Sequence, residues 1–245
     1  MRYKLTIEYE GTGFFGWQRQ DSGPSVQQAI EEAALLLCGE TVTVYAAGRT
    51  DSGVHATGQV AHIDISREFL ERNVRDGLNF HMRFLPVRIL KVEIAPPDFH
   101  ARFSAIERAY LFRISNRRVS PALEKNRVWW VAKPLDHLAI AEGAARLLGR
   151  HDFTSFRASE CQADSALKTL DELSVSREGD EIHFIARARS FLHHQVRNMV
   201  GTLKLVGDGK LTPDDISRIL AAKDRKQAGP TAPASGLYLT SVGYP

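Results

Sequence analysis

The sequence predicts an α+β protein made of two halves, each with helices packed on an antiparallel sheet. Strand and helix patterns follow one another in the order βαββαβ up to Pro96 and Pro97, and the order partly recurs afterwards without repeating the sequence. The composition, 43% hydrophobic and 25% charged over 245 residues, is typical of a soluble globular protein with a sizeable core. We therefore divide the chain into a first half, residues 1–105, and a second half, residues 106–245.

The first half begins with residues 2–10, where apolar and polar side chains alternate as in a half-buried strand. A helix follows, because Ser25 and Gln28 have the spacing of a capping box and Gly39 can end the helix. The other expected elements are strands at 41–47, 59–65 and 87–94 and a helix at 66–79 with Phe69, Leu70, Val74 and Leu78 facing inward. This order predicts a ferredoxin-like, or split βαβ, half.

The second half contains a hairpin over 170–188 that turns at Gly179 and Asp180. One helix should begin at Asp136 and end at Gly149, and another should cover 212–223 with Thr212 as its cap and Pro213 in first position. The remaining expected elements are strands at 108–115, 127–132 and 236–244 and a helix at 191–207. The sheets of the two halves can join side by side, and the crevice between them is the natural place for a site.

The charge is unevenly distributed although the net charge is only +3. Residues 101–130 contain seven basic and two acidic side chains, and residues 182–207 contain basic side chains and histidines without an acid. Aromatic residues lie within both stretches, which favours a polyanion such as RNA as partner over a merely solvated face. The N-terminal sequence has no apolar signal segment and no stretch is long enough to cross a bilayer, so we expect a cytoplasmic protein without membrane contact.

Glycines 11, 13 and 16 spell G-x-G-x-x-G directly after the first strand. In a dinucleotide site these glycines open a helix whose N-terminus faces the pyrophosphate, but here the helix is capped only at Ser25. The pattern therefore argues against a nucleotide cofactor and for a bent loop. A dinucleotide oxidoreductase stays as an alternative that a test for bound NAD or FAD would decide.

Metal or disulfide chemistry is not indicated either. His55 and His62 are seven residues apart, and His193 and His194 are adjacent, which would point them to different sides of a helix. Neither pair has the spacing of helical metal ligands, so we expect no metal. The two cysteines, Cys38 and Cys161 in the sequence, have no spacing typical of a disulfide framework or a zinc site.

The segment 46–64, AAGRTDSGVHATGQVAHID, presents a single acid, Asp51, close to Arg49 and flanked by glycines. Hydrolases of the serine type need a nucleophile with a histidine, and ordinary glycosidases need two carboxylates. An aspartate held by an arginine stays ionised when a substrate excludes water, so it can act as a nucleophile or a base. A buried structural pair of Asp51 and Arg49 is the alternative interpretation.

The motif GRTDSGVHATGQV resembles the signature of the tRNA pseudouridine synthase A family. The segments YEGTGFFGWQRQ, FHARFSAIERAYLF, HDFTSFRASEC, FLHHQVRNMVG and GLYL also resemble family segments in the family's order, so the resemblance covers nearly the whole chain. It implies two α/β halves whose antiparallel sheets join around a central basic cleft. It also implies isomerisation of uridines at positions 38 to 40 of the tRNA anticodon arm, no cofactor, and a homodimer. Two departures are Ser52, where alanine is frequent, and Lys168, where arginine is expected.

The resemblance also implies roles for five residues. Asp51 falls on the catalytic aspartate, and Arg49 falls on the arginine that fills the space of the flipped uridine. Tyr110 matches the tyrosine that stacks on the target base and can remove its C5 proton. Arg197 matches the partner of the acid, and Leu237 matches an apolar residue at the pocket. Such groups suit base flipping, which costs a few kcal/mol of unstacking that aromatic and basic contacts must offset.

A rival hypothesis from another class is a noncatalytic RNA-binding module built on split βαβ sheets. That module would carry exposed aromatic residues on a strand in the pattern of an RNA recognition motif, which this sequence does not contain. It would also give no use to Asp51. The sequence therefore favours an enzyme that modifies RNA.

Overall fold

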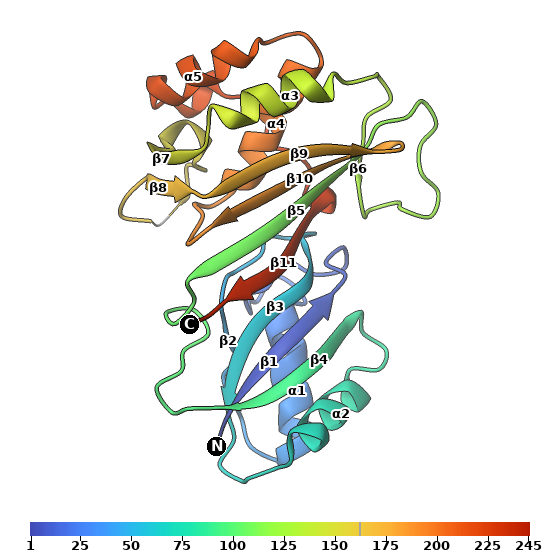
Figure 1. The fold of residues 1–245 in the computed structure, drawn as a ribbon. Helices are drawn as coiled ribbons and strands as arrows, with labels where there is room; N and C mark the ends of the chain where they lie inside the picture. Colours follow the sequence, from blue (N-terminus) through green and yellow to red (C-terminus); the bar gives the residue numbers. More distant parts are fainter. Residues whose placement is uncertain (162) are drawn as a thin grey trace. The chain divides into compact units, whose positions relative to one another are not determined.

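The computed structural model describes residues 1–161 and 163–245 and divides the chain into two compact units. Unit 1 comprises Met1–Ile106 and Tyr238–Pro245, and unit 2 comprises Glu107–Leu237 (Figure 1). Both are mixed α/β with mostly antiparallel strands, and the described residues form five α-helices in all. The sequence-based division placed residues 106–245 together, whereas the last strand packs largely with unit 1. No helix in the described part of the chain combines the length and apolar character that crossing a bilayer requires.

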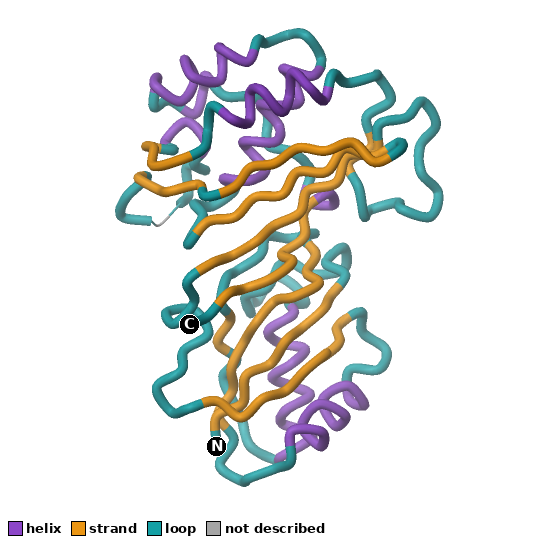
Figure 2. Tube along the Cα trace, viewed as in Figure 1, coloured by secondary structure: helices purple, strands orange, loops and turns teal. Residues whose placement is uncertain are grey.

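Unit 1 is built on three main strands, β1 (Arg2–Tyr9), β3 (His55–Asp64) and β4 (Val87–Ala95), with β1 in the middle and antiparallel to both neighbours. The short β2 (Tyr45–Ala46) is antiparallel to β3, and Tyr238 and Leu239 of β11 (Leu237–Gly243) pair with β3 in parallel. Helices α1 (Val26–Cys38) and α2 (Glu71–His81) lie on one face of this sheet (Figures 1 and 2).

The first strand and the first helix form as the sequence predicts. Tyr3, Leu5 and Ile7 on β1 are fully buried, while the residues between them are more exposed, because successive side chains of a strand point to opposite faces. The Ser25 side chain accepts a hydrogen bond from the Gln28 backbone at the start of α1, and Gly39 ends the helix in the left-handed region at φ 78°.

The expected strand over 41–47 is confirmed only for Tyr45 and Ala46. Val42 and Val44 are buried, as a strand pattern requires, but the backbone N–H of Val44 donates to Oε1 of Glu31 on α1 at 3.2 Å. The Glu31 side chain therefore accepts the hydrogen bond that a neighbouring strand would otherwise accept from Val44.

The second helix begins at Glu71, so the prediction that it begins at residue 66 is wrong. The Ser66 N–H donates to the Glu40 carboxylate at 2.9 Å, and the Tyr3 hydroxyl is bonded to both the N–H and the C=O of Phe69. A helix that began at residue 66 would need the Phe69 carbonyl as an acceptor, and this carbonyl is instead bonded to Tyr3. Leu70, expected to face inward, is 59% exposed.

The outer edge of β4 is covered by side chains of α2. The Asn79 amide donates to the carbonyl of Ile89 at 2.9 Å and accepts from its N–H at 2.8 Å, and the Glu71 carboxylate accepts from the N–H of Ile94 at 3.1 Å. Unpaired edge groups are a template for pairing with another chain, so these bonds protect the sheet edge.

Unit 2 contains an antiparallel sheet of β5 (Glu107–Ser115), β10 (Glu181–Ala188) and β9 (Glu172–Glu178), with β10 in the middle. Its helices lie on one side of this sheet (Figure 1) and are α3 (His137–Ala145), α4 (Gln195–Gly207) and α5 (Pro213–Ala222). A small second sheet pairs β7 (Gly149–Asp152) with β8 (Leu167–Leu170), and β6 (Trp129–Trp130) pairs in parallel with the end of β5. Single 3-10 turns occur at Thr154–Phe156, Arg225–Gln227 and Ala234–Gly236.

The hairpin and the N-terminal caps of unit 2 confirm the sequence analysis, but the prediction that the helix after Asp136 ends at Gly149 is wrong. This helix ends at Ala145, and Gly149, with a φ of 94°, begins β7. Asp136 caps α3 by accepting from two backbone N–H groups at 3.0 Å, and Thr212 forms a capping box with Asp215 beside Pro213. The small sheet of β7 and β8 was not predicted because its four-residue strands carry no alternation of apolar and polar residues.

Several arginines of the basic stretches are engaged inside unit 2. Arg113 forms a bidentate pair with Glu181 at 2.9 and 2.8 Å, and Arg187 pairs with Glu172 at 2.8 Å. Arg108 is buried and donates to a backbone carbonyl at 2.7 Å. The sequence count of basic residues therefore overstates the positive charge that unit 2 offers to a polyanion.

His62 on β3 is a buried neutral histidine rather than a ligand. Its Nδ1 accepts the backbone N–H of Ala101 at 3.1 Å, and its ring lies against that of Tyr45 with centroids 5.0 Å apart. Burial lowers the pKa of His62 to about 4, and the positive charges of Arg2 and His100 act in the same direction.

We expect this histidine to make the fold less stable in mild acid. An unfolded chain protonates histidine near pH 6.5 but the folded one does so only near pH 4, so the free energy of unfolding falls between these values, by about 2 to 3 kcal/mol at pH 4.5. Urea unfolding midpoints at pH 7 and 4.5 measure the loss. His62→Asn, which keeps an acceptor for the Ala101 N–H, should flatten the dependence, and an unchanged pH profile in this variant would contradict the assignment.

Candidate active site

The loop of residues 47–54, here called the acid loop, connects β2 to β3 and carries Asp51. On the N-terminal side of the acid, the carbonyl of Gly48 accepts from Nε2 of the fully buried Gln59 at 2.7 Å. The hydroxyls of Thr50 and Tyr9 share a buried hydrogen bond of 2.7 Å. Side chains of β1 and β3 therefore fix the backbone that leads to the acid.

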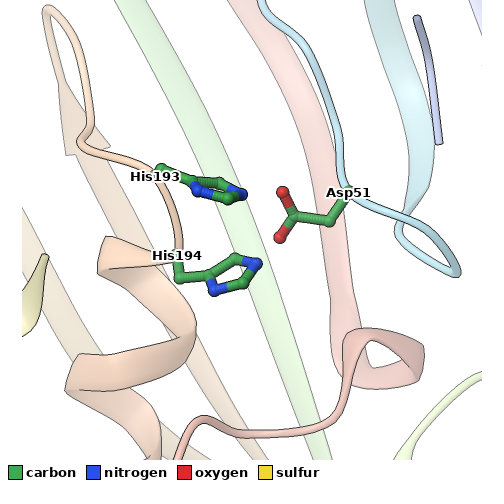
Figure 3. A group of neighbouring side chains, drawn as sticks. All are labelled: Asp51, His193 and His194. Atoms are coloured by element: carbon green, nitrogen blue, oxygen red, sulfur yellow. The ribbon is translucent and has the colours of Figure 1, made fainter. Parts of the chain in front are cut away.

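The C-terminal side of the acid loop is a tight turn. The N–H of Val54 donates to the carbonyl of Asp51 at 3.1 Å, and Gly53 adopts a φ of 78°, which favours glycine. The Ser52 hydroxyl donates to the carbonyl of Phe14 at 3.1 Å, which gives this departure from the family pattern a local use. The half-buried Asp51 is thus presented just before the first residues of β3 (Figure 3).

Two glycines of the segment 11–17, the glycine loop, allow it to approach the acid loop closely. A Cβ on Gly11 would lie 2.0 Å from the carbonyl oxygen of Val54, and one on Gly16 would lie 2.7 Å from that of Thr50. Gly16 also has a φ of 97°, and the N–H of Trp17 donates to the Thr50 carbonyl at 3.0 Å. The G-x-G-x-x-G spelling therefore reflects backbone packing against the acid loop.

We expect Gly16→Ala to reduce both stability and activity, because the new methyl group would displace the Thr50 carbonyl next to Asp51 and strain a positive φ. The expected loss of stability is about 1 to 3 kcal/mol. Gly13→Ala is the matched control, since a Cβ there meets nothing within 4 Å. Thermal unfolding and turnover of the two variants give the comparison, and equal behaviour would show that the glycine loop does not position the acid.

His55 anchors the same region. The N–H of Gly11 donates to its Nδ1 at 3.0 Å, and its buried ring stacks on Tyr238 with centroids 4.7 Å apart. This geometry makes Nδ1 an acceptor and gives His55 a structural role. Among the described residues, neither unit by itself brings three His, Cys, Asp or Glu side chains close enough to hold a metal ion.

In unit 2, Tyr110 lies on β5 opposite Ala186 of β10. Its half-buried ring meets the ring of Phe191 edge-on, with centroids 5.2 Å apart and planes at 89°. Edge-to-face packing orients an aromatic ring. Tyr110 is therefore held in a defined orientation by the segment that precedes α4.

Arg197 lies in the first turn of α4 and is anchored to the segment that follows α5. Its Nε donates to the carbonyl of Ala232 at 2.8 Å, while the N–H of Ala232 donates to the carbonyl of Arg197 at 3.1 Å. The buried Asn198 holds the same segment, because its Oδ1 accepts from Thr231 at 2.6 Å and from Arg225 at 3.1 Å. This network fixes one edge of the Arg197 guanidinium.

His193 and His194 precede α4, so the expectation that they lie on a helix and point to different sides is wrong. Their rings lie beside each other with centroids 4.0 Å apart (Figure 3). His194 caps the helix in the left-handed region at φ 60°, which is uncommon for a residue other than glycine. The chain therefore turns sharply between Phe191 and Arg197.

Leu237 begins β11 and is buried. The residue before it, Gly236, packs flush on Phe112 of β5, since a Cβ there would lie 2.6 Å from the ring. A larger residue at 236 would displace the backbone of Leu237.

The five residues singled out from the sequence thus fall into two groups. Arg49 and Asp51 share the acid loop of unit 1, where Arg49 is exposed, and Tyr110, Arg197 and Leu237 belong to unit 2. Sequence reasoning missed the buried neutral groups that hold these residues, which are Tyr9, Thr50, Gln59 and Asn198. Little in the sequence pointed to them, since Gln59 lies in β3 among other polar residues such as Thr57 and His62.

Comparison with known proteins gives one consistent result. The family model described as tRNA pseudouridine synthase matches residues 5–104 and 144–245. This chain is 62% identical over 243 residues to the protein named tRNA pseudouridine synthase A from Paramagnetospirillum magneticum, and the match covers 99% of this chain and 95% of that protein. The protein of the same name from Rhodospirillum centenum is also 62% identical over 243 residues, with 99% of each chain covered. The protein of that name from Rhizobium meliloti is 57% identical, with 99% of each chain covered.

Proposed function

Since the chain belongs to the tRNA pseudouridine synthase family, we propose that it isomerises uridine to pseudouridine in tRNA. The observation that carries the proposal is similarity over nearly the full chain together with a rigid loop that presents Asp51. The reaction breaks the N1–C1′ bond, turns the uracil and joins C5 to C1′, so the C5 proton leaves and N1 gains one. No atom is oxidised or reduced, and the chemistry needs a persistent anion.

The proposed substrates are uridines 38 to 40 of the anticodon stem-loop, and the proposed catalytic group is Asp51. Support comes from the acid loop, which carries Asp51 as its only carboxylate and is bonded on both sides of it. A preorganised carboxylate spends little energy on reorganisation as charge develops during the reaction. It can act as a nucleophile or as a base.

The other four residues are proposed to bind the flipped uridine and its surroundings. Tyr110 stacks on the base, which is consistent with a ring oriented by Phe191. Arg197 serves as countercharge to Asp51, Leu237 contributes an apolar wall, and the exposed Arg49 fills the gap in the RNA stack. Such contacts offset the cost of unstacking.

The proposed architecture is two ferredoxin-like halves around a basic cleft, with the acid in the first half and the base-binding residues in the second. The strand order β4-β1-β3-β2 and the element order βαββαβ of unit 1 support the ferredoxin-like description. We propose a cytoplasmic location, because the proposed substrate is tRNA.

The test is to incubate unmodified tRNA with the pure protein and to map pseudouridine by chemical labelling. We expect new pseudouridine at positions 38 to 40 only. Binding of tRNA without pseudouridine at any position would favour a noncatalytic RNA-binding module instead.

We further propose a homodimer, which the resemblance to the family implies, that binds tRNA largely through phosphate contacts. The logarithm of the affinity should fall by about 0.9 per tenfold rise in salt for each duplex phosphate neutralised. Light scattering and filter binding across a salt series measure both properties. A fully active monomer at assay concentration would refute the dimer.

A further inference from the structure

The turn of residues 82–86 connects α2 to β4 (Figure 1). Phe84 is 86% exposed, and Phe80 at the end of α2 is 61% exposed. The guanidinium of Arg83 lies 4.7 Å from the Phe80 ring centroid and 4.6 Å from that of Phe84. We call Phe80, Arg83 and Phe84 the aromatic turn.

A second arginine makes the aromatic turn rigid. Arg88 donates through Nη1 to the carbonyls of Met82 at 3.1 Å and Leu85 at 2.7 Å, and through Nη2 to the carbonyl of Arg83 at 3.0 Å. Flexible loops lose conformational entropy when they bind, whereas a turn fixed in advance does not. The structure therefore holds Phe84 ready for contact.

The aromatic turn lies at the same end of the unit 1 sheet as the acid loop. The N–H of Glu10 donates to the carbonyl of Pro86 at 3.0 Å, which ties the turn to the residue before the glycine loop. The next residue, Gly11, packs on Val54 of the acid loop. A substrate that reaches Asp51 is therefore close to the turn.

We propose that the aromatic turn is a stacking platform for an unpaired base of the RNA substrate, distinct from the target uridine. This inference rests on the proposed function, which supplies RNA as the partner. Aromatic and guanidinium planes bind bases of any identity by stacking and cation–π attraction. No carboxylate in residues 1–161 and 163–245 forms an ion pair with Arg83, so its positive charge remains on the platform and suits a polyanion better than a second copy of the chain.

Phe84→Ala is expected to weaken the binding of unmodified tRNA about tenfold. KM should rise in proportion while kcat at saturating tRNA stays that of the wild type, because the platform does not touch the reacting uridine. The dependence of affinity on salt should keep its slope, since no phosphate contact is lost. Phe84→Trp should bind as tightly as the wild type.

Leu36→Ala is the matched control, because Leu36 is 67% exposed on α1 of the same unit and should leave tRNA affinity unchanged. Circular dichroism and thermal unfolding verify that each variant is folded, and Phe84→Ser gives a second variant should the alanine variant fold poorly. Unchanged tRNA affinity in a folded Phe84 variant would overturn the proposal. Dissociation of a dimer into monomers by Phe84→Ala would overturn it too, by showing that the turn contacts a second copy.

The test of the stacking platform can be distinguished from the test of the proposed function. Binding is measured with unmodified tRNA and does not depend on turnover, whereas the proposed function stands or falls with pseudouridine made by the wild type. A wild type that binds tRNA without modifying it, and loses affinity on Phe84→Ala, would sink the activity and keep the platform. An active wild type whose Phe84→Ala variant binds tRNA as tightly as the wild type would support the activity and overturn the platform.

Discussion

Replacing Asp51 by asparagine is expected to reduce pseudouridine formation by at least about 10⁴-fold, with tRNA affinity within a few-fold of the wild type. Asparagine keeps the shape of the side chain, and the bonds made by Thr50, Gln59 and the backbone of the acid loop do not use the carboxylate. The substitution therefore removes the negative charge with little change of shape. Single-turnover assays with excess enzyme measure the chemical step directly.

Asp76→Asn is a suitable control for the loss of a negative charge. Asp76 lies on α2 of the same unit in an exposed pair with Arg75, and exposed pairs contribute little to stability. Asp76→Asn should form pseudouridine at the same rate as the wild type. Substantial turnover by Asp51→Asn would exclude Asp51 as the catalytic group. It would support the alternative that Asp51 and Arg49 form a structural pair.

The second large effect is expected for Arg197→Met, which should abolish activity at neutral pH and restore part of it as the pH rises. If Arg197 is the countercharge of Asp51, its removal raises the pKa of a desolvated carboxyl, and a higher pH is then needed to ionise it. Arg197→Met also removes the Nε bond to Ala232, so Arg197→Lys separates the effect of charge from that of position. Single-turnover rates from pH 6 to 10 give the profile.

Arg49→Met provides the contrast. Arg49 is exposed on the acid loop two residues from Asp51 and is expected to act on the RNA stack. Its loss should slow flipping with little rescue by pH, and the defect should be smaller for a uridine already unstacked in a loop than for one paired in a stem. A pH-rescued Arg49 variant beside a pH-insensitive Arg197 variant would show that the two roles are exchanged.

Local sequence determined most elements whose ends are marked by local chemistry. The strand at β1 follows from strict alternation, and α1 and α5 follow from caps whose donor and acceptor lie within three residues, as with Ser25 and Gln28 or Thr212 and Asp215. The candidate residues were also visible in the sequence, because charged and aromatic groups stand out within motifs that resemble one family.

Tertiary structure decided the rest, since the deciding partners are distant in sequence. Tyr3 and Glu40 hydrogen-bond to backbone groups of Phe69 and Ser66, and α2 begins only at residue 71. Glu31 accepts the backbone N–H of Val44, which lies outside β2. The close packing of the glycine loop against the acid loop could not be predicted from the sequence either. It depends on carbonyls 2 to 3 Å from where a Cβ on Gly11 or Gly16 would stand. Only the folded backbone creates that approach, because a steric limit between segments some 40 residues apart has no local signature in the sequence.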